Sequence, residues 1–145
     1  VRDTSGAIYR VTSSDSKNPT VEYKKTTAVV GGSVKIKSSV KVLGITYKIT
    51  AIAANTFKNN KKITSVTVGS NVTSIGKSAF EKCKKLSSIT FKGKKAPDIG
   101  KAAFKGIKKK TSVQVAGSMK KGQVKKLQKR MKTAAPSVKI TYKKK

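Results

Sequence analysis

Residues 63–85, with the sequence ITSVTVGSNVTSIGKSAFEKCKK, form one unit of a repeat that occupies the middle of the chain. Phe57, Phe80 and Phe104 hold the same place in successive units, separated by 23 and then 24 positions. The isoleucines Ile52, Ile75 and Ile99 keep the same two gaps. A fixed period of this length is typical of proteins whose stacked units bury their apolar faces against one another. The sequence therefore predicts a strand-rich α/β fold in the form of a right-handed solenoid.

Each unit is expected to contribute one strand to a parallel sheet. The predicted strands are Ile63–Val68, Leu86–Phe91 and Thr111–Val115. The segment Lys77–Cys83, which follows Ile75 and Gly76, is predicted to form a short helix or a 3₁₀ turn. Gly76 recurs as Gly100, which indicates a tight corner at that position. The three phenylalanines are expected to stack in one column behind the strands.

An N-terminal β region is predicted for residues 1–48, before the repeats at 49–115. Strands are expected at Ala7–Val11 and Val21–Lys25, and the pair Gly31 and Gly32 breaks the run that follows. A tight hairpin is then expected to join Val40–Val42 to Ile45–Ile49 across Leu43 and Gly44. All of this belongs to one domain that covers residues 1–145.

A helix and a strand are predicted to close the C-terminal end, at residues 116–145. The helix is expected over Ser118–Lys132, because Val124, Leu127 and Met131 fall on one face and lysines cover the rest. Such a basic amphipathic helix can also lie on a membrane. We favour a cap, since repeat proteins need a polar outer face at their ends. Val138, Ile140 and Tyr142 then alternate as a last strand.

The charge of the chain indicates an anionic partner. Lys and Arg number 35 against 5 acidic residues, which gives a formal net charge of +30. Only Arg2, Arg10 and Arg130 are arginines. Lysine is a hydrated point charge, whereas the planar fork of arginine suits the reading of guanine or of a fixed phosphate geometry. This composition favours a diffuse anionic polymer over base-specific binding to a nucleic acid.

The residues needed for most catalytic and metal sites are scarce. The chain has no histidine, one cysteine and five acidic residues, so few groups could perform acid–base chemistry or complete a zinc site. Cys83 holds a fixed place in the repeat and is expected to be a buried structural thiol. No apolar run approaches the ~18 residues of a membrane span. We expect a monomeric, non-enzymatic protein with no cofactor, no metal and no transmembrane segment.

The repeats resemble those of a known family. The segments SIGKSAFEKCKKLSSI at 74–89 and AIAANTFKNNKKITSV at 51–66 are similar to the BspA-like, Treponema-type leucine-rich repeat. The flanks resemble the ends of lysine-rich surface proteins from gut Firmicutes. This resemblance implies an extracellular location at the cell surface or cell wall. Departures from the family pattern are Leu43 in the hairpin, Ala53 at the repeat glycine and Lys110 at the start of the third strand.

Repeat register predicts two rows of lysines as the candidate site. One row holds Lys61, Lys84 and Lys108, and the next holds Lys62, Lys85 and Lys109. Adjacent lysines should lie about 5 Å apart, the spacing of neighbouring strands. In a further row Lys58 and Lys105 flank Glu81, whose charge relieves some repulsion. The rows are either a solvated convex face or a binding surface for an anionic polymer such as teichoic acid or an acidic glycan.

The outward face of the strands is the alternative site, because it is an uncharged surface rich in hydroxyl groups. Its predicted members are Thr64, Ser65, Thr67, Ser87, Ser88 and Thr90, followed by Thr111, Ser112 and Gln114. Threonine also suits strands intrinsically, so these residues have a structural explanation as well. If the face has a function, the chain would be an adhesin that recognises a host protein with its concave strand face. Nucleic-acid binding is disfavoured, because no aromatic residues alternate with the basic rows.

Overall fold

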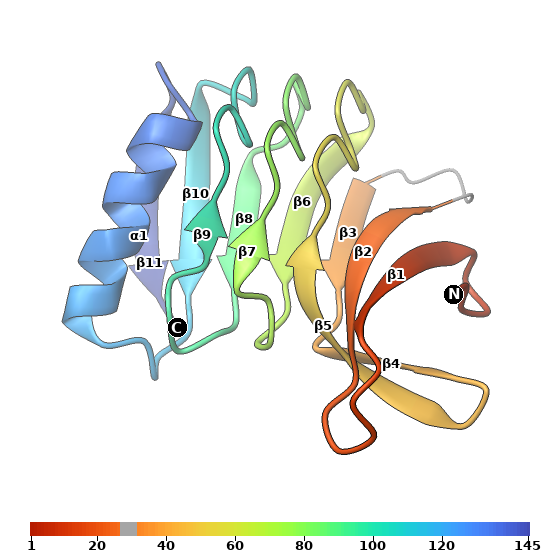
Figure 1. The fold of residues 1–145 in the computed structure, drawn as a ribbon. Coiled ribbons are helices and arrows are strands. Elements are labelled where there is room, and N and C mark those ends of the chain that lie inside the picture. The colour runs from red at the N-terminus through yellow and green to blue at the C-terminus, as the bar shows by residue number, and fades with distance from the viewer. Residues whose placement is uncertain (27–31) are drawn as a thin grey trace.

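The computed structural model describes residues 1–26 and 32–145, and in them the fold is strand-rich α/β with two sheets and one helix (Figure 1). The first sheet has the strand order β1-β2-β5-β7-β9, with β4 paired to β5. The second has the order β11-β10-β8-β6-β3. The elements of the first sheet are β1 (Ala7–Ser13), β2 (Thr20–Thr26), β4 (Ser39–Val42), β5 (Ile45–Ile52), β7 (Ser74–Ile75) and β9 (Asp98–Ile99). Those of the second are β3 (Gly32–Ile36), β6 (Ile63–Val68), β8 (Ser88–Phe91), β10 (Lys110–Val115) and β11 (Lys139–Lys144).

Within each unit the chain crosses from the second sheet to the first, as from β6 to β7 and from β8 to β9 (Figure 1). Neighbouring units pair in parallel with Val66 opposite Ile89 and Ile89 opposite Val113. The pairing follows the predicted gaps of 23 and 24 residues. The strand predicted at Ile63–Val68 is confirmed, whereas β8 begins two residues later than predicted and β10 one residue earlier.

The N-terminal part contains the predicted hairpin and one strand of the repeat sheet that the sequence pattern did not assign. Val42 pairs with Ile45 in an antiparallel register, and Leu43 and Gly44 between them have φ of 50° and 79°. Leu43 therefore fits the tight turn despite its side chain, which is 96% exposed. Upstream, β3 pairs in parallel with β6, so the second sheet begins before residue 49. Of the predicted break, Gly31 lies outside the described residues.

The predicted phenylalanine column forms the centre of the core. The rings of Phe57 and Phe80 stack with centroids 5.1 Å apart, and those of Phe80 and Phe104 stack at 5.2 Å. Tyr23 of β2 continues the column by stacking on Phe57 at 5.6 Å, and Tyr9 of β1 meets Tyr23 edge to face. The N-terminal strands thus supply the aromatic layer that a further repeat would otherwise provide.

The segment Lys77–Cys83 forms a series of turns closed by hydrogen bonds between residues three apart. Of the two predicted forms, a short helix or a 3₁₀ turn, the helix is wrong. Alternate backbone N–H groups, those of Ser78, Phe80 and Lys82, donate to carbonyl oxygens of the next unit at 3.1, 2.7 and 2.7 Å. The N–H groups between them close turns inside the unit. Ser78 and Lys82 adopt left-handed φ of 59° and 60°, which turns every second N–H toward the neighbour. A helix would consume these donors and leave the neighbour's carbonyl groups unpaired.

The recurring glycine is required because the backbone of the preceding unit lies against it. A Cβ at Gly76 would lie 2.4 Å from the backbone N of Ala54, and one at Gly100 would lie 2.5 Å from that of Lys77. Ala53 fills the same position in the first unit, where its N–H donates to the Tyr23 carbonyl of β2, a strand that lies outside the predicted repeats. The predicted tight corner is therefore a close approach of two backbones.

The helix α1 (Lys121–Ala134) packs against the last repeat, beside β9 (Figure 1). Leu127 and Met131 are fully buried, and Val124 is half-buried. At the end of the helix the Ala134 carbonyl accepts a hydrogen bond of 3.0 Å from the Phe104 N–H. The carbonyl thus occupies the place that the next unit takes elsewhere in the repeats.

Truncation of the central ring should destabilise the fold strongly. We expect Phe80→Ala to lower the free energy of unfolding by about 3 to 5 kcal/mol, because the fully buried ring contacts a ring on either side. Ser112→Ala, at an exposed position of β10, should change it by less than about 0.5 kcal/mol. Urea titration measures both values. A loss below about 1 kcal/mol for Phe80→Ala would contradict a continuous column.

Adding a methyl group should have opposite effects at two glycines. Gly76→Ala should destabilise by about 1 to 3 kcal/mol, because its Cβ collides with the backbone of the preceding unit. Gly122→Ala should stabilise by about 0.5 to 1 kcal/mol, since a Cβ there meets no atom within 4 Å and alanine favours a helix. Thermal unfolding of both variants tests the close packing of units. Equal effects of the two substitutions would refute it.

Candidate functional site

The structure places all six predicted lysines at exposed positions of the connections that lead into the strands of the second sheet. These connections form the upper edge of the molecule in Figure 1. The phenylalanine column before them and the strands after them share the same offsets of 23 and 24 residues. In each unit the lysines lie between the phenylalanine and the strand, so the same offsets hold them in two aligned rows. In the first row, Lys61 lies beside Lys84, and Lys84 lies beside Lys108.

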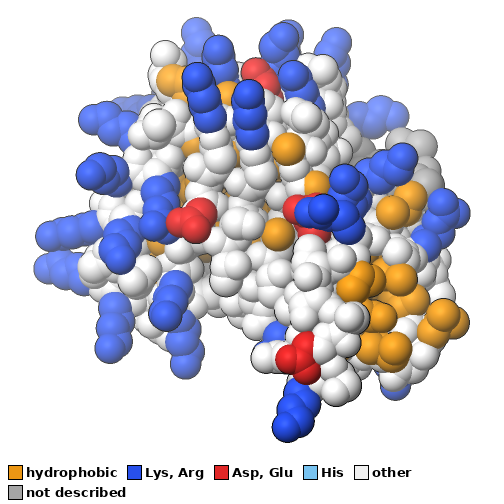
Figure 2. Space-filling view, viewed as in Figure 1, with side chains coloured by type: hydrophobic (Ala, Val, Ile, Leu, Met, Phe, Trp, Pro, Cys, Tyr) orange, Lys and Arg blue, Asp and Glu red, His pale blue; other side chains and the backbone are white. Residues whose placement is uncertain are grey.

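Within residues 1–26 and 32–145, three ion pairs form between side chains, and the six lysines take part in none of them. Glu81 belongs to the adjacent row, where its carboxylate lies 3.6 Å from the Lys58 ammonium group. A hydrogen bond from Ser78, followed by the charges of Lys58 and Lys105, lowers the pKa of Glu81. Figure 2 shows lysine and arginine side chains along this edge and acidic groups only at scattered points. The two rows are thus a surface of uncompensated positive charge.

The lysine rows end at a surface hollow of about 570 Å³. Lys84, Lys108 and Lys109 line one side of it, and Ser137 and Val138, which precede β11, line the other. The hollow arises because β11 continues the sheet while the connection before it departs from the pattern of the repeat. Half of the predicted lysines therefore border a concave surface, which can contact more of a ligand than a flat one.

The strand face is a second ordered surface, and it crosses five strands. Residues paired across the sheet form one row of hydroxyl groups: Ser33, Ser65, Ser88, Ser112 and Thr141. The next row holds Lys35, Thr67, Thr90, Gln114 and Lys143. Of the other predicted members, Thr64 is exposed and Ser87 is half-buried.

The prediction that Thr111 faces outward is wrong. Its side chain is 3% exposed, and its Oγ1 donates a hydrogen bond of 2.8 Å to the Lys108 carbonyl. This bond ties the second residue of β10 to the connection before it. The extra residue of this unit lies earlier, between β8 and β9, because the spacing from Phe104 to Val113 equals that from Phe80 to Ile89.

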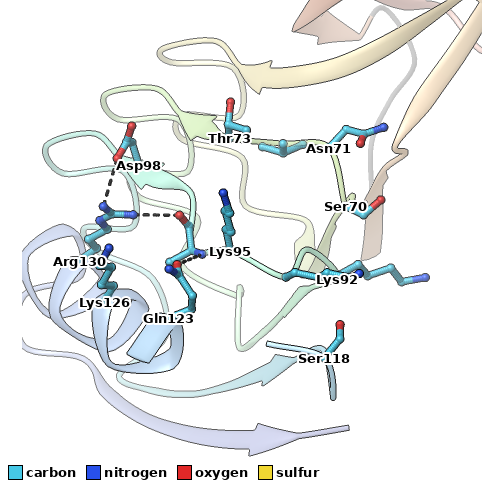
Figure 3. A pocket seen from close by; sticks show the side chains of 13 residues that line it. Ser70, Asn71, Thr73, Lys92, Lys95, Asp98, Ser118, Gln123, Lys126 and Arg130 are labelled. Carbon is cyan, nitrogen blue, oxygen red and sulfur yellow. Dashed lines mark hydrogen bonds and ion pairs between the residues drawn. The ribbon is translucent and has the colours of Figure 1, made fainter. Parts of the chain in front are cut away.

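A third feature, which the sequence analysis missed, is a groove of about 700 Å³ between α1 and the connections that follow β6 and β8 (Figure 3). Its walls come from three stretches of chain: residues 70–73, 92–98 and 118–130. These stretches lie far apart in the sequence, so no local motif announces the groove. The one sequence feature that could have indicated the groove is Arg130, the single arginine of a predicted helix whose other basic residues are all lysines. The structure shows this residue to be half-buried.

Arg130 and Gln123 join the helix to the opposite wall of the groove. The Arg130 guanidinium donates to the carbonyl oxygens of Ala96 and Pro97 at 2.9 and 3.0 Å and lies 3.3 Å from the Asp98 carboxylate. The Gln123 Oε1 accepts a hydrogen bond of 3.1 Å from the Ala96 N–H. Figure 3 shows both side chains reaching from α1 to this segment. Two polar side chains therefore hold α1 to the segment 96–98 along one side of the groove.

Cys83 is a structural thiol. It is fully buried, and its Sγ donates to the Phe57 carbonyl at 3.1 Å. Burial raises the pKa of the Cys83 thiol to about 11, so it stays protonated and unreactive near neutral pH.

No group of three or more metal-binding side chains occurs among the described residues. Within the same residues, no helix is long and apolar enough to cross a membrane.

Comparison with protein families identifies the repeats. The family model described as "BspA type Leucine rich repeat region" matches residues 33–131, in six copies. The chain belongs to this family. The match begins at β3, well before residue 49, in agreement with the early start of the second sheet. A comparison with curated proteins finds no match.

Three solved structures share the fold of this BspA-type chain. One is a leucine-rich repeat protein from Bacteroides capillosus, with 19% identity and a TM-score of 0.65, and the match covers 97% of this chain and 96% of that one. A leucine-rich cell surface protein from Faecalibacterium prausnitzii has 22% identity and a TM-score of 0.59 over 80% of this chain. A leucine-rich repeat protein from Bacteroides ovatus has 20% identity and a TM-score of 0.57 over 99%. The matched regions are 32% and 40% of the latter two proteins.

The buried thiol gives a simple test of the repeat packing. We expect Cys83 to resist a thiol reagent at pH 8 in the folded protein and to react fully in urea. The unfolded thiol ionises near pH 9, whereas the folded thiol stays protonated up to about pH 11. Stability should therefore fall as the pH rises from 9 to 11, by more than in Cys83→Ala. Rapid labelling of the folded protein would contradict the burial.

Proposed function

We propose that the chain is a non-enzymatic binding or anchoring module that holds an anionic polymer on its two lysine rows. The observation that carries this proposal is the alignment of six exposed lysines in register, with no carboxylate paired to any of them among the described residues. Aligned like charges repel one another, and a polyanion would relieve that repulsion. The rows also border a hollow that offers a ligand additional contact.

The polymer fits by charge spacing more than by shape. Equivalent lysines on neighbouring units extend from backbones about 5 Å apart, so a chain with closely spaced anionic groups can meet several at once. Each contact releases a condensed counterion, which makes binding stronger at low salt. Teichoic acid and acidic glycans have the required charge. We take the units to wind as a right-handed solenoid, which keeps the rows straight.

We place the module outside the cell, on the surface or wall. Membership of the BspA-type family supports this location, as does the description of the Faecalibacterium prausnitzii structure as a cell surface protein. The alternative partner is a host protein bound by the hydroxyl rows of the strand face. That face is mostly uncharged, so binding there would depend little on ionic strength, in contrast to the lysine rows.

Removal of the row charges should weaken polymer binding. The test variant replaces Lys61, Lys62, Lys84, Lys85, Lys108 and Lys109 with Gln. A control variant replaces six other exposed lysines, Lys17, Lys24, Lys25, Lys41, Lys48 and Lys121, and has the same net charge. Binding to purified teichoic acid and to polygalacturonate is measured by calorimetry across a range of salt concentrations. We expect at least about tenfold weaker binding and a flatter salt dependence in the test variant alone.

Two outcomes would contradict the proposal. Equal losses in the two variants would assign binding to net charge, with no role for the rows. Unchanged binding in the test variant would leave the lysines as solvated surface. In that case Ser88→Ala and Thr90→Ala in the strand face would be the next substitutions to examine.

A further inference from the structure

The groove beside α1 carries positive charge that no acidic residue neutralises. Lys92, Lys94, Lys95 and Lys126 line it, and none of them takes part in an ion pair within the described part of the chain. The one carboxylate in the lining, that of Asp98, is paired with Arg130. Figure 3 shows Lys95 between the helix and the opposite wall that carries Thr73. The groove therefore presents ammonium groups to anything that enters it.

The groove also contains neutral polar groups that a simple anion would not use. The Asn71 amide nitrogen donates to the Ser38 carbonyl at 3.0 Å, which leaves its Oδ1 as an acceptor for a ligand. The Thr73 hydroxyl donates to the Thr50 carbonyl, so its oxygen can also accept. On the other wall, the Gln123 Oε1 is occupied by the Ala96 N–H, which leaves the amide nitrogen as a donor. Donors and acceptors on facing walls suit a ligand that carries hydroxyl groups.

These observations point to one class of ligand. We propose that the groove binds a short acidic oligosaccharide, whose carboxylate meets Lys95 and Lys126 and whose hydroxyl groups meet Asn71, Thr73 and Gln123. Its volume of about 700 Å³ lies within the ordinary range for small-molecule sites and accommodates a few sugar units. The walls are already braced by Arg130, so a ligand has little structure to order on binding.

Three features favour a carboxylated sugar over other ligands. The lining has no aromatic side chain, so it lacks the stacking platform that a neutral sugar would need to bind well. Arg130, the one arginine in the lining, is already bound to Ala96, Pro97 and Asp98 and has few N–H groups left to bind a phosphate. An ionised phosphodiester group offers no O–H to the Asn71 and Thr73 acceptors, whereas each sugar unit carries several hydroxyl groups. The site is separate from the lysine rows and does not depend on the function proposed for them.

The test uses digalacturonate as the probe and its dimethyl ester as a neutral control of the same shape. A glycerol phosphate dimer serves as the phosphate probe. Binding is followed by calorimetry and by NMR shifts of backbone amides. We expect one site per chain for digalacturonate, at least tenfold weaker binding of the ester, and shifts confined to residues 70–73, 92–98 and 118–130.

The variants separate the groove from net charge and from the rows. Lys95→Gln with Lys126→Gln should weaken digalacturonate binding at least tenfold. Lys121→Gln with Lys125→Gln, which removes the same charge from exposed positions of α1 outside the groove, should leave it within twofold. Thr73→Val should weaken digalacturonate binding by a larger factor than any binding of the phosphate probe, which carries fewer hydroxyl groups. The six-lysine row variant should still bind digalacturonate.

Each contrary result has a definite meaning. Equal losses in the two double variants would overturn the groove as a site. Tighter binding of the glycerol phosphate dimer than of digalacturonate would overturn the assignment to an acidic sugar. Loss of digalacturonate binding in the row variant would move the ligand to the rows. If the row variant binds both digalacturonate and long polymers as the unmodified protein does, the function proposed for the rows is refuted. The groove is then still supported as a separate site.

Discussion

Backbone hydrogen bonds between successive units fix the rest of this structure. They run through three places in each unit: a strand of the second sheet, a short strand of the first sheet and the turn segment around the phenylalanine. In the turn segment, Phe57 donates to the Ala79 carbonyl and Phe80 donates to the Ala103 carbonyl, both at 2.7 Å. A unit that slipped by one residue would break all three sets at once. Register is therefore rigid, and equivalent side chains must lie in rows.

Rigid register has a cost where the repeated residue is charged. The lysines of each unit lie beside the equivalent lysines of the neighbouring units and repel them. The net charge of +30 adds repulsion over the whole molecule. The core offsets this repulsion with fully buried apolar side chains and stacked rings at every level of the repeat. Salt or a bound polyanion would screen the repulsion without altering a single contact in the core.

The repeated parts of the fold were accessible from the sequence because each observation was made three times. The phenylalanine column, the strand at Ile63–Val68 and the paired lysine rows all follow from one period. The turn segment was not predictable. Left-handed residues such as Ser78 and Lys82, with φ of 59° and 60°, donate their N–H groups to carbonyl oxygens of the next unit, and no residue pattern in the sequence marks this pairing. The alternation of Val34 and Ile36 is visible in the sequence, but the place of β3 in the repeat sheet was missed because its unit is interrupted by the β4 hairpin.

The groove was invisible to sequence reasoning for a related reason: it forms where the repeat stops. Inside the array, every connection is covered by the next copy of itself, so neighbouring units leave little space between them. After β9 the helix α1 replaces that copy, and its straight axis cannot follow the bends of the preceding connections. Space is left between them, and Arg130 and Gln123 bridge it at the points where the two surfaces touch. Under the two proposals, the periodic edge binds an extended polymer and the irregular end binds a small ligand. Substitutions at the irregular end therefore separate the two sites, because no other unit repeats the residues there.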